Sequence, residues 1–171
     1  MLTEEQLFTR FAGKSLLLDS NLLLVYLCGH LGPQNFKRFK RVSDYTIDDY
    51  ELLVRLLRHF SVLVTTPHIL TEVSNLANSL PAWLKPSWSQ IFTTLLALQG
   101  EAHGFREHWT PAADLVKMPE FAEFGITDSA LTKLSPEALV ITEDYRLSGT
   151  LRSRGIPVIN FGDLRKIQQH L

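Results

Sequence analysis

The sequence predicts one α/β domain over residues 1–171, with a central parallel sheet between two layers of helices. Short apolar segments alternate with helical patterns along the chain, which is typical of a parallel sheet. These segments are apolar throughout, as expected for strands that are covered on both faces. A chain of 171 residues that is 45% hydrophobic and 20% charged can bury a substantial core and is not expected to be disordered.

The N-terminal segment begins with a helix signal and continues into the first strand. Thr3 and Gln6 form a capping-box pattern, and Gly13 is placed to end the helix that follows. Residues 15–18 predict a buried strand that ends at Asp19. Residues 22–27 then predict a buried helix, so the chain opens with a helix, a strand and a second helix.

The next elements follow a long basic segment. Residues 29–50 begin as a loop, and Thr46 is expected to cap a helix over about 48–59. Residues 61–65 predict the second strand. Pro67 suits the first turn of the helix that follows.

The C-terminal half is less regular at first. Residues 86–99 predict a helix and 110–117 a short one, while the stretch between them shows no clear periodicity. Thr127 or Asp128 is expected to cap a further helix. This part of the chain then ends with two strands and a closing helix, at residues 138–142, 156–160 and 162–170.

Composition and charge restrict the function classes. The longest apolar stretch, 15–32, is interrupted by polar residues 19–21, so no transmembrane segment is expected. Glu4 and Glu5 at the N-terminus do not resemble a secretory signal, and a cytoplasmic location is predicted. A net charge of −1 provides no global field to attract nucleic acid, so RNA binding would require local basic patches.

Four acidic residues occupy matching positions in this pattern. Asp19 and Asp144 directly follow predicted strands, while Glu72 and Asp128 lie near helix starts. Ligands of open parallel sheets bind outside the carboxyl ends of the strands, so these four side chains are expected to meet there. Taken singly, each acid could instead be a helix cap or a favourable charge near a helix N-terminus. The prediction of a common site therefore rests on the four acids taken together.

A cluster of carboxylates predicts a bound cation. Like charges that lie close together raise one another's pKa values unless a cation neutralises them. Oxygen ligands favour Mg²⁺ or Mn²⁺ over zinc. The chemistry that fits such a site is phosphodiester hydrolysis, in which metal ions activate a water molecule and stabilise the leaving oxygen.

The segments around these acids resemble the motifs of the PIN-domain family of nucleases. The similar segments, in the order of the family, are LLDSNLL at 17–23, TPHILTEV at 66–73, GITDSAL at 125–131 and LVITEDYRL at 139–147. The resemblance covers about residues 15–162. It implies a three-layer fold and Mg²⁺- or Mn²⁺-dependent cleavage, usually of RNA. It also implies that Asp19, Glu72, Asp128 and Asp144 bind metal, with Asn21 and Thr142 as polar supports, although Asn21 could equally be a turn residue.

The resemblance adds expectations about partners. Small prokaryotic members resemble the toxins of toxin–antitoxin pairs, which are commonly dimers held inactive by a partner protein. An antitoxin protein and a homodimer thus join RNA as candidate partners. The segments 29–50 and 81–117 are longer than in compact members of the family, which affects any inference about substrate and partners.

Several other residues are candidates for RNA contact. Arg146 follows Asp144 closely enough to reach a scissile phosphate. The basic loop could hold a phosphate backbone while its aromatic residues stack a base, or it could be a solvated loop with two anchoring aromatics. Tryptophans are expected to pack in the core or a subunit contact rather than recognise bases. The loop residues are Lys37, Arg38, Lys40 and Arg41 with Phe36 and Phe39, and the tryptophans are Trp83, Trp88 and Trp109.

Two alternative functions compete with the nuclease. Asp19 at the end of the first strand would also suit a phosphatase with an aspartate nucleophile, although Asn21 stands where an acidic partner is expected. A PIN fold that no longer cuts and serves as a binding or scaffold module is the second alternative. The presence of all four acids argues against that alternative.

Overall fold

The computed structural model describes residues 3–98, 104–135 and 138–169, with side chains described as far as residue 166. Its strands are β1 (Ser15–Leu18), β2 (Val62–Thr65), β3 (Phe105–Glu107), β4 (Leu139–Thr142) and β5 (Val158–Asn160). Its α-helices are α1 (Glu4–Phe11), α2 (Ser20–Gly29), α3 (Ile47–Leu57), α4 (Pro67–Ala77), α5 (Lys85–Ala97), α6 (Ala112–Leu115), α7 (Phe121–Leu134), α8 (Tyr145–Ser153) and α9 (Phe161–Gln169). Two 3₁₀ helices span Pro33–Arg38 and Ala82–Leu84.

The five strands form one parallel sheet in the order β3-β2-β1-β4-β5. Leu17 of β1 pairs with Val64 of β2 on one side and with Val140 of β4 on the other. The chain therefore builds outward from β1 through β2 to β3, and then returns to the opposite side of β1 to add β4 and β5. The carboxyl ends of β1 and β4 flank the point at which the strand order reverses, where open α/β sheets bind their ligands.

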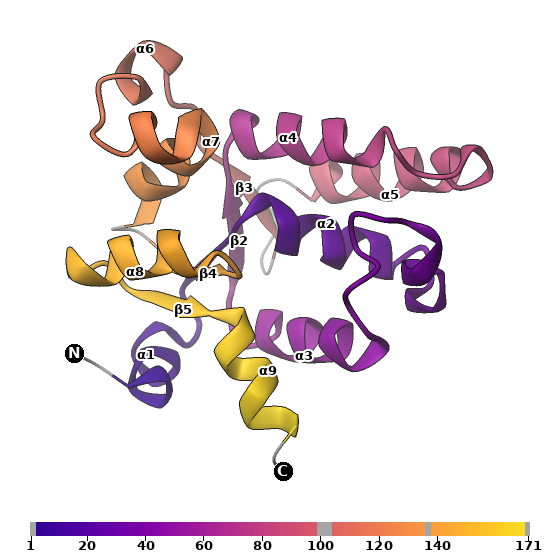
Figure 1. The fold of residues 1–171 in the computed structure, drawn as a ribbon, viewed down its shortest axis with the longest axis horizontal. Helices are drawn as coiled ribbons and strands as arrows, with labels where there is room; N and C mark the ends of the chain where they lie inside the picture. Colours follow the sequence, from indigo (N-terminus) through magenta and orange to yellow (C-terminus); the bar gives the residue numbers. More distant parts are fainter. Residues whose placement is uncertain (1–2, 99–103, 136–137, 170–171) are drawn as a thin grey trace.

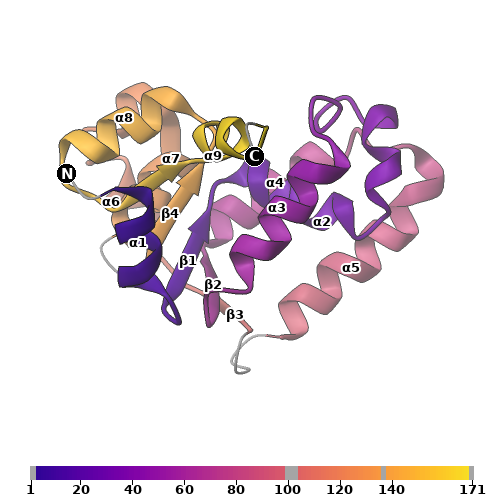
Figure 2. The ribbon, with the colours of Figure 1, turned by 90° about the horizontal axis from the view of Figure 1, so that it is seen from below.

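Helices cover both faces of the sheet. Helices α2 to α5 lie on one side of it, and α1, α6, α7 and α8 lie on the other (Figures 1 and 2). The inner strands β1 and β4 are buried along almost their whole length, in agreement with their continuous apolar sequence. The predicted α/β fold, with three layers and a parallel central sheet, is confirmed.

Local sequence signals place several of the helices. The Thr3–Gln6 capping box is present at the start of α1. Thr46 caps α3 through a second reciprocal pair with Asp49. Asp19 is the N-cap of α2, because its Oδ1 accepts a hydrogen bond of 2.7 Å from the backbone N–H of Leu22. The end of β1 and the start of α2 are thus fixed by the same side chain.

The region without clear periodicity differs most from expectation. It contains the edge strand β3, which was not predicted, and α6 is shorter than the expected helix. Helix α7 begins at Phe121 and is interrupted at Gly125, whose φ of 82° and ψ of −171° are not helical. The cap assignment to Thr127 or Asp128 is therefore wrong, since both lie in the first turn after this kink. Glycine suits the kink because side-chain-bearing residues rarely adopt this positive φ.

None of the described helices combines the length and the apolar character that spanning a lipid bilayer requires.

Candidate functional site

Asp19 is the most deeply placed of the four predicted site residues, with 6% of its surface exposed. Its Oδ2 accepts hydrogen bonds from Thr142 Oγ1 at 2.5 Å and from the backbone N–H of Glu143 at 3.0 Å. Burial raises the pKa of this carboxyl, while the hydrogen bonds from Leu22, Thr142 and Glu143 oppose the increase. Asp19 consequently joins the ends of β1 and β4 and is held in one orientation.

Thr142 and Asp144 complete the turn that follows β4. The Thr142 hydroxyl also accepts a hydrogen bond of 3.0 Å from the backbone N–H of Asp144. Asp144 caps α8, because its Oδ1 accepts hydrogen bonds from the N–H groups of Arg146 and Leu147 at 2.7 and 3.0 Å. Asp144 is exposed, and its other carboxylate oxygen accepts no hydrogen bond from the described residues.

Glu72 reaches the same edge of the sheet from α4. Its Oε2 accepts a hydrogen bond of 3.0 Å from the hydroxyl of Ser20, the first residue of α2. Ser20 directly follows Asp19, so this bond ties Glu72 to the end of β1. The contribution of Ser20 depends on the packing of α2 against α4 and was not predicted from the sequence.

Asp128 shows that the four acids lie close enough to interact. Burial, together with the negative charges of Asp19, Glu72 and Asp144, raises the pKa of Asp128 to about 7. The structure thus brings together four carboxyl groups that are widely separated in the chain. We call Asp19, Glu72, Asp128 and Asp144 the acidic cluster.

The acidic cluster carries no compensating side-chain charge within the described residues. None of its four members forms an ion pair with lysine or arginine there. Across the same part of the chain, no three Asp, Glu, His or Cys side chains are arranged as a set that could hold a metal ion. The donor chemistry nevertheless fits a hard divalent cation, because the cluster offers only carboxylate oxygens. The single cysteine, Cys28, is buried elsewhere in the core.

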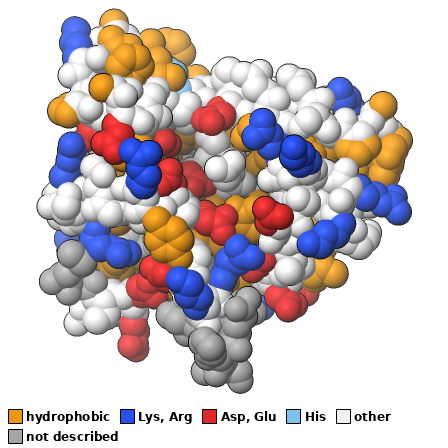
Figure 3. Space-filling view, in the orientation of Figure 1, with side chains coloured by type: hydrophobic (Ala, Val, Ile, Leu, Met, Phe, Trp, Pro, Cys, Tyr) orange, Lys and Arg blue, Asp and Glu red, His pale blue; other side chains and the backbone are white. Residues whose placement is uncertain are grey.

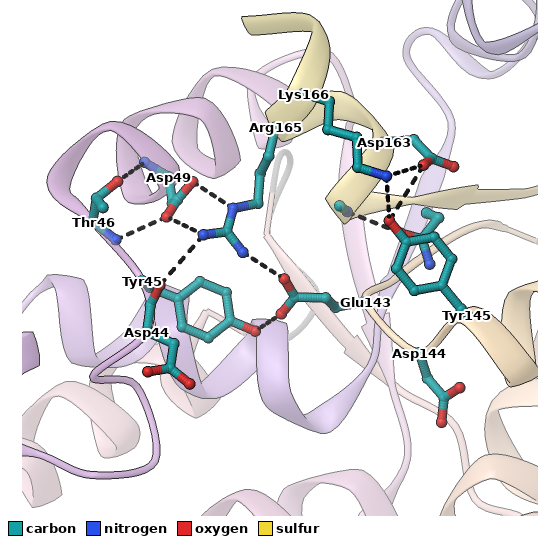
Figure 4. Close-up of polar contacts among 12 residues, drawn as sticks. Asp44, Tyr45, Thr46, Asp49, Glu143, Asp144, Tyr145, Asp163, Arg165 and Lys166 are labelled. Atoms are coloured by element: carbon teal, nitrogen blue, oxygen red, sulfur yellow. Dashed lines mark hydrogen bonds and ion pairs between the residues drawn. The ribbon is translucent and has the colours of Figure 1, made fainter. Parts of the chain in front are cut away.

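A second group of charged residues lies beside the cluster, and its carboxylates are paired with an arginine. Arg165 of α9 contacts both carboxylate oxygens of Asp49, at 2.8 and 3.0 Å, and Glu143 Oε1 at 2.7 Å. Tyr45 donates a hydrogen bond to the other oxygen of Glu143. Figure 4 shows Glu143 pointing toward Arg165 and Tyr45, while Asp144 points away from them. The consecutive acids Glu143 and Asp144 therefore belong to different environments.

The predicted supports and RNA-contacting residues differ in their surroundings. Asn21 is exposed and forms no side-chain hydrogen bond among the described residues, unlike Thr142. Arg146 is paired with Glu123 of α7 at 2.8 Å, so in this structure its guanidinium group contacts a carboxylate. The four basic side chains of the loop are exposed. They are Lys37, Arg38, Lys40 and Arg41.

The aromatic residues correct two sequence-based interpretations. Phe36 and Phe39 are buried in the core, so they anchor the basic loop and cannot stack on a base. Trp88 packs in the core as expected, but Trp83 and Trp109 are 58% and 78% exposed, so core packing is wrong for both and a subunit contact stays a prediction for them. Burial of these residues depends on tertiary packing, which their aromatic character alone does not determine.

The raised pKa of Asp128 makes the stability of the metal-free protein depend on pH. The carboxyl ionises near 3.8 in the unfolded chain but near 7 in the fold, so the folded state holds the proton more tightly. The free energy of unfolding should therefore fall as the pH rises from about 4 to about 7, and stay lower above that range. Since the side chain is partly exposed to screening solvent, we expect a loss of about 1 to 2 kcal/mol.

Urea unfolding of the wild type and of Asp128→Asn in EDTA measures this effect. The variant should gain about 1 to 2 kcal/mol relative to the wild type between pH ~4 and pH ~8, because the amide carries no charge at either pH. A stability difference that is the same at both pH values would contradict the electrostatic coupling.

Acidic and basic side chains are unevenly distributed over the surface of the protein. Figure 3 shows acidic side chains toward the middle of one face, with lysine and arginine side chains around them. Such a surface can hold a cation at its centre and a polyanion at its margin. No protein-family model, curated protein or solved structure matches this chain.

Proposed function

We propose that the chain is a metal-dependent endoribonuclease of the PIN-domain class, which hydrolyses RNA phosphodiester bonds with Mg²⁺ or Mn²⁺. The observation that carries the proposal is the meeting of four carboxyl groups at one edge of the sheet, where the charges of three of them help to raise the pKa of Asp128. A cluster of carboxylates without lysine or arginine partners is stabilised by a divalent cation. Its position beside the reversal of strand order is also where α/β folds bind ligands.

The residues of the cluster would hold the ion in different ways. Mg²⁺ is commonly bound by one or two carboxylates, with water and substrate phosphate completing its shell, so three protein ligands are not required. Asp19 would present a carboxylate fixed by its contacts with Thr142 and Glu143. Asp144 keeps one oxygen in the α8 cap and has the other for an ion or its bound water. When bound, the cation would lower the pKa of an attacking water and stabilise the leaving oxygen.

The two alternatives are less well supported. An aspartate nucleophile needs an accessible oxygen, whereas Asp19 is almost fully buried and both of its oxygens accept hydrogen bonds. In a scaffold that does not cut RNA, the repulsion among the four acids that raises the pKa of Asp128 would serve no function. Asp19 Oδ1 accepts one hydrogen bond and keeps a second lone pair for a cation, so metal-dependent hydrolysis is compatible with the first feature and accounts for the second.

The direct test combines cleavage and metal binding. The purified chain should cleave single-stranded RNA in Mn²⁺ or Mg²⁺ and lose this activity in EDTA, with products followed on a gel. Calorimetric titration should detect Mn²⁺ binding to the wild type and a much weaker signal for Asp19→Ala and Asp128→Ala. Failure of the wild type to cleave single-stranded or structured RNA with either ion would overturn the proposal.

The expected partners and location belong to the same proposal. An antitoxin protein would be captured by co-purification from a native host, and a homodimer would be detected by light scattering. A cytoplasmic location, where RNA and Mg²⁺ are both abundant, would be tested by cell fractionation.

A further inference from the structure

A groove of about 480 Å³ borders the acidic cluster between α4 and α7. Glu72 lines it and also belongs to the cluster, and Thr127 lines it next to Asp128 in the chain. The groove is therefore continuous with the proposed cleavage site. The side chains lining it are Pro67, His68, Thr71, Glu72, Asn75, Trp109, Ile126 and Thr127.

Trp109 lines this groove and is the most exposed large hydrophobic side chain among the described residues. Its side chain is 78% exposed, although exposed indole rings are unfavourable in water. The backbone around it is nevertheless fixed, because the N–H of His108 donates a hydrogen bond of 2.9 Å to the carbonyl of Thr65, and Thr110 is buried. The backbone therefore holds Trp109 at the carboxyl end of the sheet, with its side chain exposed. An exposed aromatic ring that lines a groove is available to stack on a bound planar group.

The side chains that line the groove indicate what kind of chemical group it can bind. Apart from Glu72 and His68, the groove is lined by uncharged side chains, so it suits an uncharged group better than a phosphate. Thr71, Asn75 and Thr127 offer hydroxyl and amide groups that can bond to the edge of a base. The Nδ1 atom of His68 is buried and has no hydrogen-bond partner in the described part of the chain.

We propose that this groove binds one unpaired base of a single-stranded RNA substrate, stacked on Trp109, while the adjoining phosphate lies at the acidic cluster. The inference rests on the proposed nuclease function and adds a substrate requirement to it: the nucleotide beside the cut must be unpaired. Stacking on an aromatic side chain accepts any base, since every base has a π face. The hydroxyl and amide groups of the groove would then add a preference among bases.

The test measures how strongly binding depends on bases. The affinity for a short single-stranded RNA is compared with that for a ribose-phosphate chain of equal length without bases, by fluorescence anisotropy in Mg²⁺. The Asp128→Asn background prevents cleavage during the measurement. Trp109→Ala should reduce the preference for the base-containing chain by about tenfold. Trp109→Phe should keep most of it, and Trp109→Leu, which is apolar but has no π face, should resemble Trp109→Ala.

The outcomes separate this inference from the nuclease proposal. An unchanged preference in Trp109→Ala, or an equal loss for both chains, would overturn the base subsite while leaving metal-dependent cleavage intact. Loss of binding to a co-purified protein, with the base preference unaltered, would assign Trp109 to a protein contact and would also overturn it. Base-dependent binding through Trp109 by a wild type that never cleaves would support the subsite and refute the nuclease.

Discussion

Asp128→Asn is expected to reduce metal-dependent cleavage of single-stranded RNA by about 100-fold or more. Removal of a residue that only orients a metal ligand typically reduces activity by about 10- to 100-fold, and loss of a ligand should exceed that. The substitution keeps the size of the side chain and removes the charge that interacts with Asp19, Glu72 and Asp144. Initial rates of cleavage at saturating Mn²⁺ provide the measurement.

Two features of this experiment distinguish lost chemistry from lost structure. Without metal, the variant should be at least as stable as the wild type at neutral pH, because the repulsion within the cluster is relieved. Asp48→Asn is a matched control, since Asp48 is an exposed acid in the first turn of α3 and lies outside the cluster. Cleavage by Asp128→Asn at the rate of Asp48→Asn would show that the cluster does not carry the activity.

Arg165→Met is expected to destabilise the protein by about 2 to 4 kcal/mol. Removal of one partner from a buried ion pair typically costs about 3 to 5 kcal/mol, and the partial exposure of Arg165 reduces this range. The substitution would leave the buried Asp49 and the half-buried Glu143 without the cation that joins them. In a domain of this size the melting temperature should fall by about 5 to 15 °C, as measured by calorimetry.

Two further variants define the origin of this loss. Arg165→Lys keeps the charge but not the two parallel bonds to Asp49, so it should recover only part of the stability. Arg55→Met removes an exposed pair with Glu51, 4.0 Å long, and should change the stability by less than about 1 kcal/mol. Equal effects of Arg165→Met and Arg55→Met would show that the Arg165 contacts contribute little.

The parts of the site that the sequence predicts are those fixed by local structure. Asp19 directly follows β1, Asp144 follows β4 after one residue, and each caps the next helix, so their placement depends on a few neighbouring residues. Glu72 and Asp128 lie on helices that follow or precede strands, and a parallel sheet brings both toward one edge. The fold class follows from the same alternation of strands and helices.

The parts that the sequence does not predict depend on distant contacts. Strand β3 has three residues, of which only Phe105 is buried, and it exists because it pairs with β2. The pairing of Glu143 with Arg165 links a turn to α9, which no local pattern indicates. The exposure of Trp109 depends in the same way on how β3 joins the sheet.

The central position of β1 has a consequence for how the acidic cluster assembles. Asp19 and Glu72 come from the part of the chain that builds outward to β3, whereas Asp128 and Asp144 come from the part that returns along the other side. If the chain were divided into two fragments between these parts, each fragment would contain two of the four carboxylates. Recovery of cleavage on mixing two separately produced fragments would therefore report that the halves had docked along the β1–β4 seam.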